Sequence, residues 1–256
     1  LEDDLDLDDH DHHNTQQRVA VFGAGGVGKS TVGKFLAGTL TDEELLKGYL
    51  DSFATEKLPI SERSFGHVLV APGRRRRQSV REELLELVRD GKIGGVINVV
   101  AYGYHSFPGD AEGFRNDAAF RDGMDPPAFM DAYLAARRRD ELEQLFEAAD
   151  ALSKAPKPLW LLTLVAKQDL WWDRREEVET HYSGGEYKSL IDRIVGGRGK
   201  RGFRHELVSA ALTWENLSYG SGETLAKTAA GYDHAARSAN LARFGRAVRQ
   251  MLDAVS

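Results

Sequence analysis

The chain has 256 residues, enough for one large domain or two small ones, and its 41% hydrophobic and 29% charged residues are ordinary for a soluble globular protein. It contains no cysteine, which excludes disulfides and thiol catalysis and fits a cytoplasmic setting. No apolar run is long enough for a transmembrane segment, and the acidic N-terminus lacks the basic start and apolar centre of a secretory signal.

The net charge of −6 is concentrated at one end of the chain. Residues 1–13 hold seven Asp and Glu residues and no Lys or Arg, so these residues carry −7 and the rest of the chain carries +1. A nearly neutral body gives no direct nucleic-acid signal. We predict that residues 1–16 form a disordered acidic tail and that residues 17–256 form one domain. The first residue is leucine rather than methionine, as expected of a trimmed or excised segment.

The strongest motif follows directly after this tail. Residues 18–22 are an apolar run typical of a buried strand, and residues 23–30 match G-x-x-x-x-G-K-[ST], the phosphate-binding P-loop. Beyond the motif, apolar residues recur at helical spacing and predict a helix to about residue 40. Strand, glycine loop and helix is the context that the P-loop needs, and the alternative is a chance glycine-rich turn.

The chemistry of a P-loop follows from its residue types. Glycines let successive backbone N–H groups turn inward and cradle phosphate oxygens, and the start of the helix adds its positive end. We expect Lys29 to place its ammonium on the outer phosphates and Ser30 to give its hydroxyl to Mg²⁺. The predicted phosphate-binding residues are Gly23, Gly25, Gly26, Val27, Gly28, Lys29, Ser30 and Thr31.

Further apolar runs and helical stripes alternate along the chain. The pattern predicts strands at residues 55–60, 67–71, 95–101, 159–166 and 206–211. It predicts a helix at 43–50 and a second one that begins with a capping box at Ser79 and Glu82 and ends at Gly91. A long helix is expected after residue 127, with its buried stripe at Leu142, Leu145, Phe146 and Ala149, and two short helices are expected in 174–194, broken at 183–185. A last helix near the end of the chain has its stripe at Leu241, Phe244, Val248 and Leu252. Loops are expected at 106–126 and 196–202. This alternation favours a mainly parallel sheet covered by helices on both faces, with ligands at the carboxyl ends of the strands.

A second motif stands at the end of the run 159–166, which is followed by Lys167-Gln168-Asp169. A carboxylate at Asp169 can accept two hydrogen bonds from the N1–H and exocyclic amine of guanine, whereas adenine has no matching donors. A buried carboxylate left unpaired costs about 1–3 kcal/mol or more. The stem of Lys167 can lie across the base and the sugar. Lys-x-Asp alone is a weak pattern, so its value lies in its order after the P-loop and the turn Pro72-Gly73.

This order of motifs resembles the small-GTPase, Ras-like branch of the P-loop GTPases, over residues 17–256. The resemblance implies an α/β P-loop NTPase fold with a mainly parallel six-stranded sheet, helices on both faces and an antiparallel edge strand near residues 55–61. It implies GTP or GDP as ligand together with Mg²⁺. It also implies that Lys167 and Asp169 select guanine, that Ser209-Ala210 gives a backbone N–H to the guanine oxygen, and that Gly73 senses the third phosphate.

In the same family a threonine is a ligand of the magnesium ion. Thr55 is our candidate for it and Thr41 is the runner-up; the alternative for each is an ordinary surface threonine. The sequence departs from the family at Val70, where an aspartate holds magnesium, and at Ala166, the first position of the base motif. Arg74 replaces a glutamine that orients the attacking water. It acts either as a built-in arginine finger beside Lys29 or, as we favour, within a basic patch at residues 74–77.

Aromatic residues at two strand ends have simpler interpretations. Tyr104 and His105 follow the run 95–101 and lie near the expected nucleotide, and Trp171 and Trp172 follow the base motif. For Tyr104 and His105 we favour a packing or surface role over contact with the nucleotide or positioning of water. For Trp171 and Trp172 we favour core or interface packing over stacking on the base.

These motifs predict a guanine-nucleotide-binding protein that hydrolyses GTP slowly or with a protein partner, which residues 41–80 contact, and that acts as a cytoplasmic molecular switch. One alternative is a non-hydrolysing pseudo-GTPase, a nucleotide-stabilised interaction module, which Val70 and Arg74 favour. Another is an ATP-dependent kinase or ATPase, against which Asp169 argues.

Overall fold

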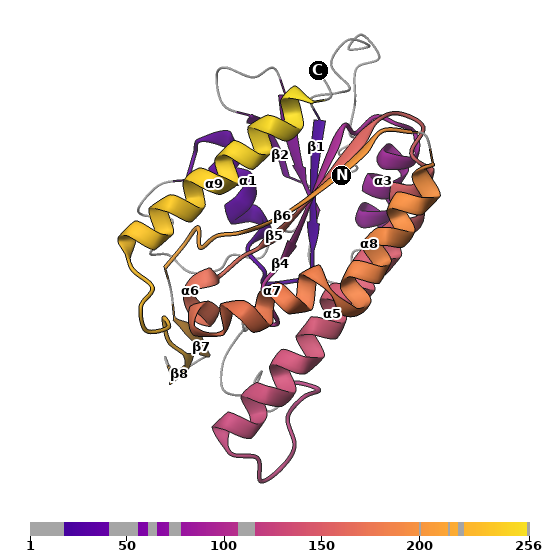
Figure 1. Cartoon of the computed structure of the whole chain (residues 1–256). Coiled ribbons are helices and arrows are strands. Elements are labelled where there is room, and N and C mark those ends of the chain that lie inside the picture. The colour runs from indigo at the N-terminus through magenta and orange to yellow at the C-terminus, as the bar shows by residue number, and fades with distance from the viewer. Residues whose placement is uncertain are drawn as a thin grey trace, which may run out of the picture.

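The computed structural model describes residues 18–40, 56–60, 66–71, 78–106, 116–199, 201–214, 216–219 and 223–254. These residues form a six-stranded sheet of order β2-β3-β1-β4-β5-β6 and a separate two-stranded sheet. Helices cover both faces of the larger sheet (Figure 1). The predicted α/β architecture, a mainly parallel six-stranded sheet between helices, is therefore confirmed.

The six strands are β1 (Arg18–Gly23), β2 (Glu56–Ile60), β3 (Gly66–Val70), β4 (Gly95–Val100), β5 (Leu159–Val165) and β6 (Phe203–Ser209). All neighbours pair in parallel except β2, which is antiparallel to β3 at the edge of the sheet, as expected. Every residue of β4 and β5 is buried, because central parallel strands are covered on both faces.

The last strand was misplaced by the sequence pattern. Residues 206–211 were predicted, but β6 begins at Phe203 and ends at Ser209. This strand lies at the edge of the sheet, and most of its residues are only half-buried, with charged residues among them. An edge strand that is partly exposed does not need a continuous apolar run, so its first residues gave no signal.

The helices divide between the two faces of the sheet (Figure 1). One face carries α1 (Lys29–Ala37) and α9 (His234–Asp253), and the other carries α3 (Gln78–Arg89), α5 (Pro126–Lys154) and α8 (Gly185–Arg198). Each set of helices packs its apolar residues against its own face of the sheet. A short α6 (Gln168–Trp171), the 3₁₀ turn η3 (Trp172–Arg174) and α7 (Arg175–Ser183) follow β5.

Two helix boundaries differ from the sequence predictions. Helix α3 begins at Gln78, so Ser79 lies inside the helix and is not its N-cap, although Gly91 ends the helix with φ +68° as expected. Helix α8 continues into the predicted loop 196–202 and ends at Arg198. The buried guanidinium of Arg198 donates to the carbonyls of Ala155 and Gly202. These hydrogen bonds, one of them to a residue 43 positions away, stabilise a glycine-containing helix end that its local sequence disfavours.

Helix α5 extends beyond the carboxyl edge of the sheet (Figure 1). Asp125 caps its start by accepting a hydrogen bond from Ala128 N at 2.8 Å. Its first turns carry Phe129 and Tyr133, which form a small core with Ala119. Leu145 and Ala149 of the predicted stripe are buried, but the side chain of Phe146 is 61% exposed, so the face of the helix that packs on the core is narrower than the sequence predicted.

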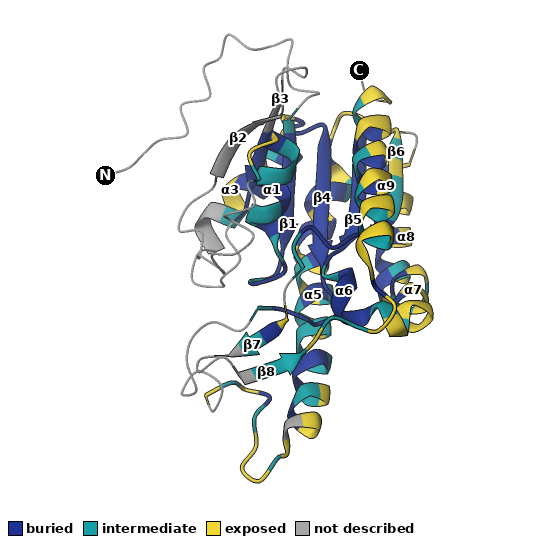
Figure 2. Ribbon diagram, turned by 90° about the vertical axis from the view of Figure 1, so that its left-hand side faces the viewer, coloured by how far each residue is buried: buried dark blue, intermediate teal, exposed yellow. Residues whose placement is uncertain are grey.

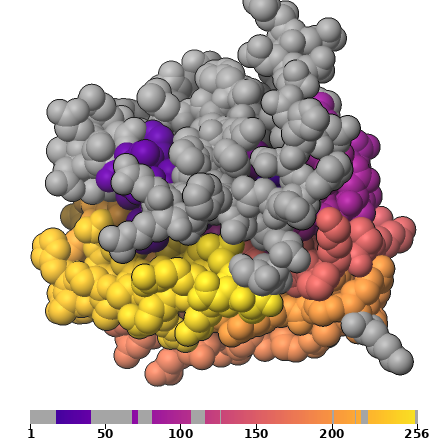
Figure 3. Space-filling model, turned by 90° about the horizontal axis from the view of Figure 1, so that it is seen from above, coloured from indigo at the N-terminus to yellow at the C-terminus, as the bar shows by residue number. Residues whose placement is uncertain are grey.

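The second sheet, β7 (Leu217–Tyr219) and β8 (Glu223–Ala226), was not expected from the sequence. It lies beside the projecting part of α5 (Figure 2). Figure 2 also shows the central strands β1, β4 and β5 buried and the outer side of α9 exposed. Helix α9 packs on β5 and β6. Its yellow surface is visible in the view from above in Figure 3. None of the described helices is long and apolar enough to cross a membrane.

Candidate functional site

The P-loop connects β1 to α1, as the sequence predicted. Gly23 and Gly26 adopt φ values of +139° and +76°, which side chains of L-residues disfavour. A Cβ atom at Gly23 would lie 2.2 Å from Val99 O, and one at Gly26 would lie 2.7 Å from Ser106 N. Both positions therefore require glycine for conformation and for space.

The start of α1 is suited to an anion. Gly28 is its N-cap, and the first turn holds no acidic residue, so the helix does not itself neutralise its positive end. The Lys29 side chain is only 7% exposed, and its Nζ donates to Ala24 O at 2.7 Å. The ammonium thus lies over the loop that would hold the phosphates. Ser30 is half-buried at the same helix end.

The second motif lies after β5. Lys167 adopts the left-handed conformation with φ +55°, and Asp169 lies in the first turn of α6. Trp171 is buried, and its Nε1 donates to Ala166 O at 2.8 Å, so this side chain packs beneath the motif as favoured from the sequence. Lys167 and Asp169 are therefore held at the carboxyl edge of the sheet by the packing of their neighbours.

Asp169 is covered by a segment that follows β8. Its side chain and backbone together are 1% exposed, and its backbone oxygen accepts from Ala229 N at 2.7 Å. Tyr232, also buried, contacts the ring of Trp172 with centroids 5.4 Å apart. Burial, together with the charge of Asp169, raises the pKa of Tyr232 to about 12. Residues 228–232, here called the cover segment, therefore lie against the residue that the sequence assigned to the base.

Ser209 ends β6, and Ala210 follows it. The Ala210 N–H, which the resemblance assigned to the guanine oxygen, donates to Val165 O at 3.1 Å. In this conformation the Ala210 amide is already used in the hydrogen bonding between β5 and β6. Arg237 holds the next residues, because its Nε donates to Ala211 O at 3.2 Å and its Nη2 donates to Leu212 O at 2.5 Å.

The segment after β4 links the two motifs. We call residues 101–106 the β4 loop. Ser106 N donates to Gly26 O at 2.8 Å, and Lys167 Nζ donates to Ser106 Oγ at 2.9 Å. Sequence reasoning missed Ser106, although its place just beyond the end of a buried strand was a signal for it.

A buried carboxylate fixes this loop. Glu141 of α5 is 2% exposed, and its Oε1 accepts from Ala101 N at 2.8 Å, Gly103 N at 3.1 Å and His105 Nε2 at 2.9 Å. Its Oε2 accepts from Tyr182 OH at 2.6 Å. Burial opposes ionisation of Glu141, but the hydrogen bonds from His105 and Tyr182 outweigh it and lower its pKa.

His105 is the buried partner of that carboxylate on the β4 loop. Burial lowers the pKa of His105, while the nearby Glu141 acts in the opposite direction. Tyr104 is buried as well. Both residues pack as favoured from the sequence, and His105 also orients the loop. Nothing in the sequence pointed to Glu141, because it lies 36 residues from His105 on another element.

The described residues do not complete a magnesium site. Ser30 offers one hydroxyl oxygen, but Val70 is fully buried in the apolar cluster that also contains Val21 and Val32. No group of three or more His, Cys, Asp or Glu residues in the described ranges is arranged to hold a metal ion. Thr41, Thr55, Gly73 and Arg74 lie outside the described residues.

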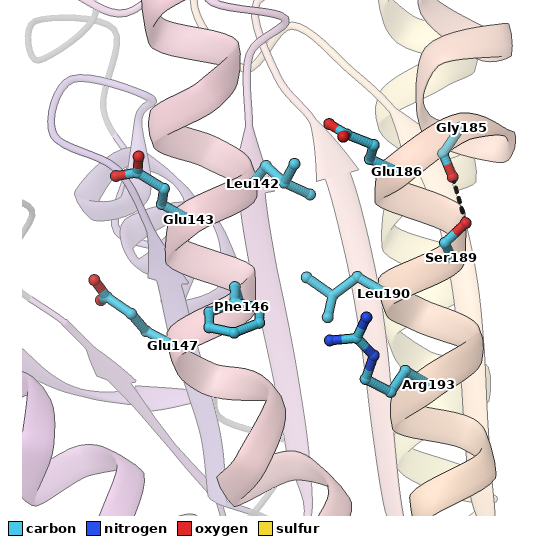
Figure 4. A pocket seen from close by; sticks show the side chains of 9 residues that line it. All are labelled: Leu142, Glu143, Phe146, Glu147, Gly185, Glu186, Ser189, Leu190 and Arg193. Atoms are coloured by element: carbon cyan, nitrogen blue, oxygen red, sulfur yellow. Dashed lines mark hydrogen bonds between the residues drawn. The ribbon is translucent and has the colours of Figure 1, made fainter.

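A groove of about 910 Å³ lies between α5 and α8 (Figure 4). Leu142 and Phe146 of α5 face Leu190 of α8 across it, with acidic side chains at its rim (Figure 4). None of the residues lining this groove belongs to the P-loop, the β4 loop or the base motif.

A mainly parallel sheet whose first strand leads through a G-x-x-x-x-G-K-[ST] loop into a helix is the fold of the P-loop NTPases. No family model and no curated protein matches the chain. Among solved structures, it is similar to the signal recognition particle receptor SRb–GDP from Chaetomium thermophilum, with 13% identity over 78% of this chain and 91% of that chain and a TM-score of 0.40.

Two further solved structures are similar. One is a putative nucleolar GTP-binding protein 1 from Plasmodium falciparum, with 12% identity over 94% of this chain and 93% of that chain and a TM-score of 0.39. The other is a small COPII coat GTPase SAR1 from Encephalitozoon cuniculi in complex with GDP, with 12% identity, coverage of 76% and 69%, and a TM-score of 0.34. Similarities this low carry no argument about what this chain binds.

Proposed function

We propose that this chain is a guanine-nucleotide-binding protein that acts as a switch and hydrolyses GTP slowly or with a protein partner. The observation that carries the proposal is the loop from Gly23 to Lys29, whose left-handed glycines and buried lysine form a phosphate cradle at a helix start that bears no acidic residue. The phosphates would lie on this loop, with Ser30 at the metal.

The base is assigned to the segment after β5. Asp169 is the acidic residue nearest to the end of that strand, and its carboxylate matches the N1–H and amine of guanine. Adenine would leave this buried carboxylate unpaired, which costs about 1–3 kcal/mol. Since the cover segment closes over Asp169, we infer that binding of the base requires this segment to move. Nucleotide association would then be slow.

Hydrolysis would depend on positioning and on charge. Lys29 would neutralise negative charge that develops on the transferred phosphoryl group, and Arg74 is proposed as a second source of positive charge. Residues 41–80, which include Arg74, are proposed as the surface that a protein partner contacts.

A second candidate function is a pseudo-GTPase that binds nucleotide without hydrolysing it. Val70 favours this alternative, because it stands where the family has a carboxylate and lies within an apolar cluster at 0% exposure. Such a chain would present a nucleotide-stabilised surface to its partner.

The binding experiment is a competition for a fluorescent GDP with Mg²⁺ present. We expect GTP and GDP to displace the probe and ATP at the same concentration not to. Lys29→Ala should abolish tight binding, whereas Lys34→Ala, in the last turn of the same helix, should retain it. Equal displacement by ATP would remove the guanine assignment, and absence of any binding would remove the whole proposal.

A single-turnover assay then separates the two functions. Release of phosphate from bound GTP above the background rate identifies a hydrolase. Recovery of intact GTP after prolonged incubation identifies the pseudo-GTPase.

A further inference from the structure

We propose that Ser106 and Glu141 are positioning residues of the nucleotide site: Ser106 ties the P-loop to the base motif, and Glu141 holds the β4 loop that carries Ser106. This inference rests on the proposed function and extends it to residues that no sequence motif contains. Neither residue is assigned a contact with the ligand.

Ser106 makes one hydrogen bond to each half of the site. Its backbone N–H donates to Gly26 O at 2.8 Å, and its hydroxyl accepts from Lys167 Nζ at 2.9 Å. Gly26 belongs to the loop assigned to the phosphates, and Lys167 belongs to the segment assigned to the base and sugar. A nucleotide must span these same two segments. Ser106 therefore sets the distance between the parts of the protein that hold its two ends.

The β4 loop has a backbone conformation that needs support. Tyr102 adopts φ +51°, which is uncommon for a residue with a side chain, and Gly103 follows with φ +83°. This turn directs the N–H groups of Ala101 and Gly103 to one carboxylate oxygen of Glu141. The Tyr102 N–H donates to Tyr182 OH at 2.9 Å, and that hydroxyl donates to Glu141.

The position of Glu141 is fixed by its own burial. A buried carboxylate is tolerated only when hydrogen bonds satisfy it, and Glu141 has four donors, three from the β4 loop and one from Tyr182 of α7. The loop is held further by Tyr133 of α5, whose hydroxyl donates to His105 O at 3.1 Å. The β4 loop is thus attached to α5 on one side and to the P-loop on the other.

The location of Glu141 suits a role in the proposed nucleotide site rather than a general role in the hydrophobic core. Among the residues that the structure describes, Glu141 and Asp169 are the acidic residues that are buried. Glu141 accepts hydrogen bonds from the loop after β4, and Asp169 lies in the segment after β5. Both segments are at the carboxyl edge of the sheet. In parallel sheets this edge is where ligands bind.

The test compares Ser106→Ala and Glu141→Gln with two matched controls, Ser189→Ala and Glu143→Gln, which lie on the exposed sides of α8 and α5. The readouts are the dissociation rate of fluorescent GDP and the affinity for inorganic triphosphate. We expect Ser106→Ala to accelerate GDP dissociation about tenfold, the effect of one lost hydrogen bond to a charged group. The affinity for triphosphate, which contacts only the P-loop, should stay within about twofold of the wild type because the loop itself is intact.

Glu141→Gln should accelerate GDP dissociation at least as much as Ser106→Ala. The double variant should add little to Glu141→Gln alone, because both substitutions act through the same loop. In addition, the amide proton resonances of Ala101 and Gly103 should move upfield when their carboxylate acceptor becomes an amide. If Glu141→Gln does not fold, the Ser106→Ala arm still decides whether the link between the two motifs matters.

Several outcomes would overturn the inference. GDP dissociation from Ser106→Ala within about twofold of the wild type would show that the link is irrelevant, and equal losses for GDP and triphosphate would show that Ser106 shapes only the P-loop. Additive effects of the two substitutions would show that Glu141 does not act through Ser106. If the wild type binds no GDP at all, the proposed function fails and takes this inference with it; if it binds GDP and the variants match it, only the inference fails.

Discussion

Substitution of Gly26 by alanine tests the contact between the P-loop and the β4 loop directly. Gly26 has φ +76°, and a Cβ atom there would lie 2.7 Å from Ser106 N and 2.8 Å from Ser106 O. Both neighbours are backbone atoms, so no side-chain rotation relieves the overlap. Gly123 offers a matched control, because its φ is +82° and a Cβ atom there would meet nothing within 4 Å.

The magnitude follows from two contributions. Both variants place an alanine in the left-handed region, which costs about 1–2 kcal/mol. Only Gly26→Ala must also push the β4 loop away, and overpacking of this kind costs about 1–3 kcal/mol. We therefore expect the free energy of unfolding to fall by about 2–5 kcal/mol for Gly26→Ala and by about 1–2 kcal/mol for Gly123→Ala.

Urea denaturation of the nucleotide-free protein, followed by the fluorescence of its four tryptophans, measures both values. Leaving nucleotide out ensures that loss of binding does not contribute to the difference. A Gly26→Ala variant as stable as Gly123→Ala would refute the reasoning, because the P-loop and the β4 loop would then not be in contact.

The remaining predictions concern the base, the core and pH. Asp169→Asn should shift nucleotide preference from guanine to xanthine in competition assays, because an amide offers a donor where the carboxylate only accepts; unchanged guanine preference would argue against the base assignment. Phe129→Ala should lower the free energy of unfolding by about 3–5 kcal/mol, since Phe129 is fully buried, whereas Phe146→Ala, at a 61% exposed position, should change it by less than about 0.5 kcal/mol. Burial, together with the charge of Lys188, lowers the pKa of His205 to about 4, so its contribution to stability is complete above its ordinary pKa of 6.5 and is lost as the pH falls from there towards 4. His205→Gln should therefore weaken the decline of stability across that interval, and an identical pH profile for variant and wild type would contradict the assigned burial.

The P-loop unit was predictable because its determinants are local. The glycines, Lys29 and the apolar spacing after them lie within one short stretch, and strand, loop and helix form from that stretch as the pattern indicates. The central strands β4 and β5 were predictable for the same reason, since strands buried on both faces are continuous apolar runs. The resemblance to a known family then supplied the sheet architecture and the antiparallel edge strand, which local patterns do not contain.

Only the folded chain showed how these parts are joined. Ser106 and Glu141 belong to no periodic pattern, and their partners lie on other elements, 61 residues away for Ser106 and Lys167 and 40 for Glu141 and Ala101. The end of α8 depends likewise on carbonyls that Arg198 meets across the fold. Phe146 is exposed although Leu145 and Ala149 of the same predicted stripe are buried, because tertiary packing decides how much of a helix face is covered. Local sequence determines which segments become strands and helices, since backbone preference and apolar spacing act over a few residues. The hydrogen bonds of a single buried side chain depend on which elements meet in space, and that is decided only when the sheet and its helices assemble.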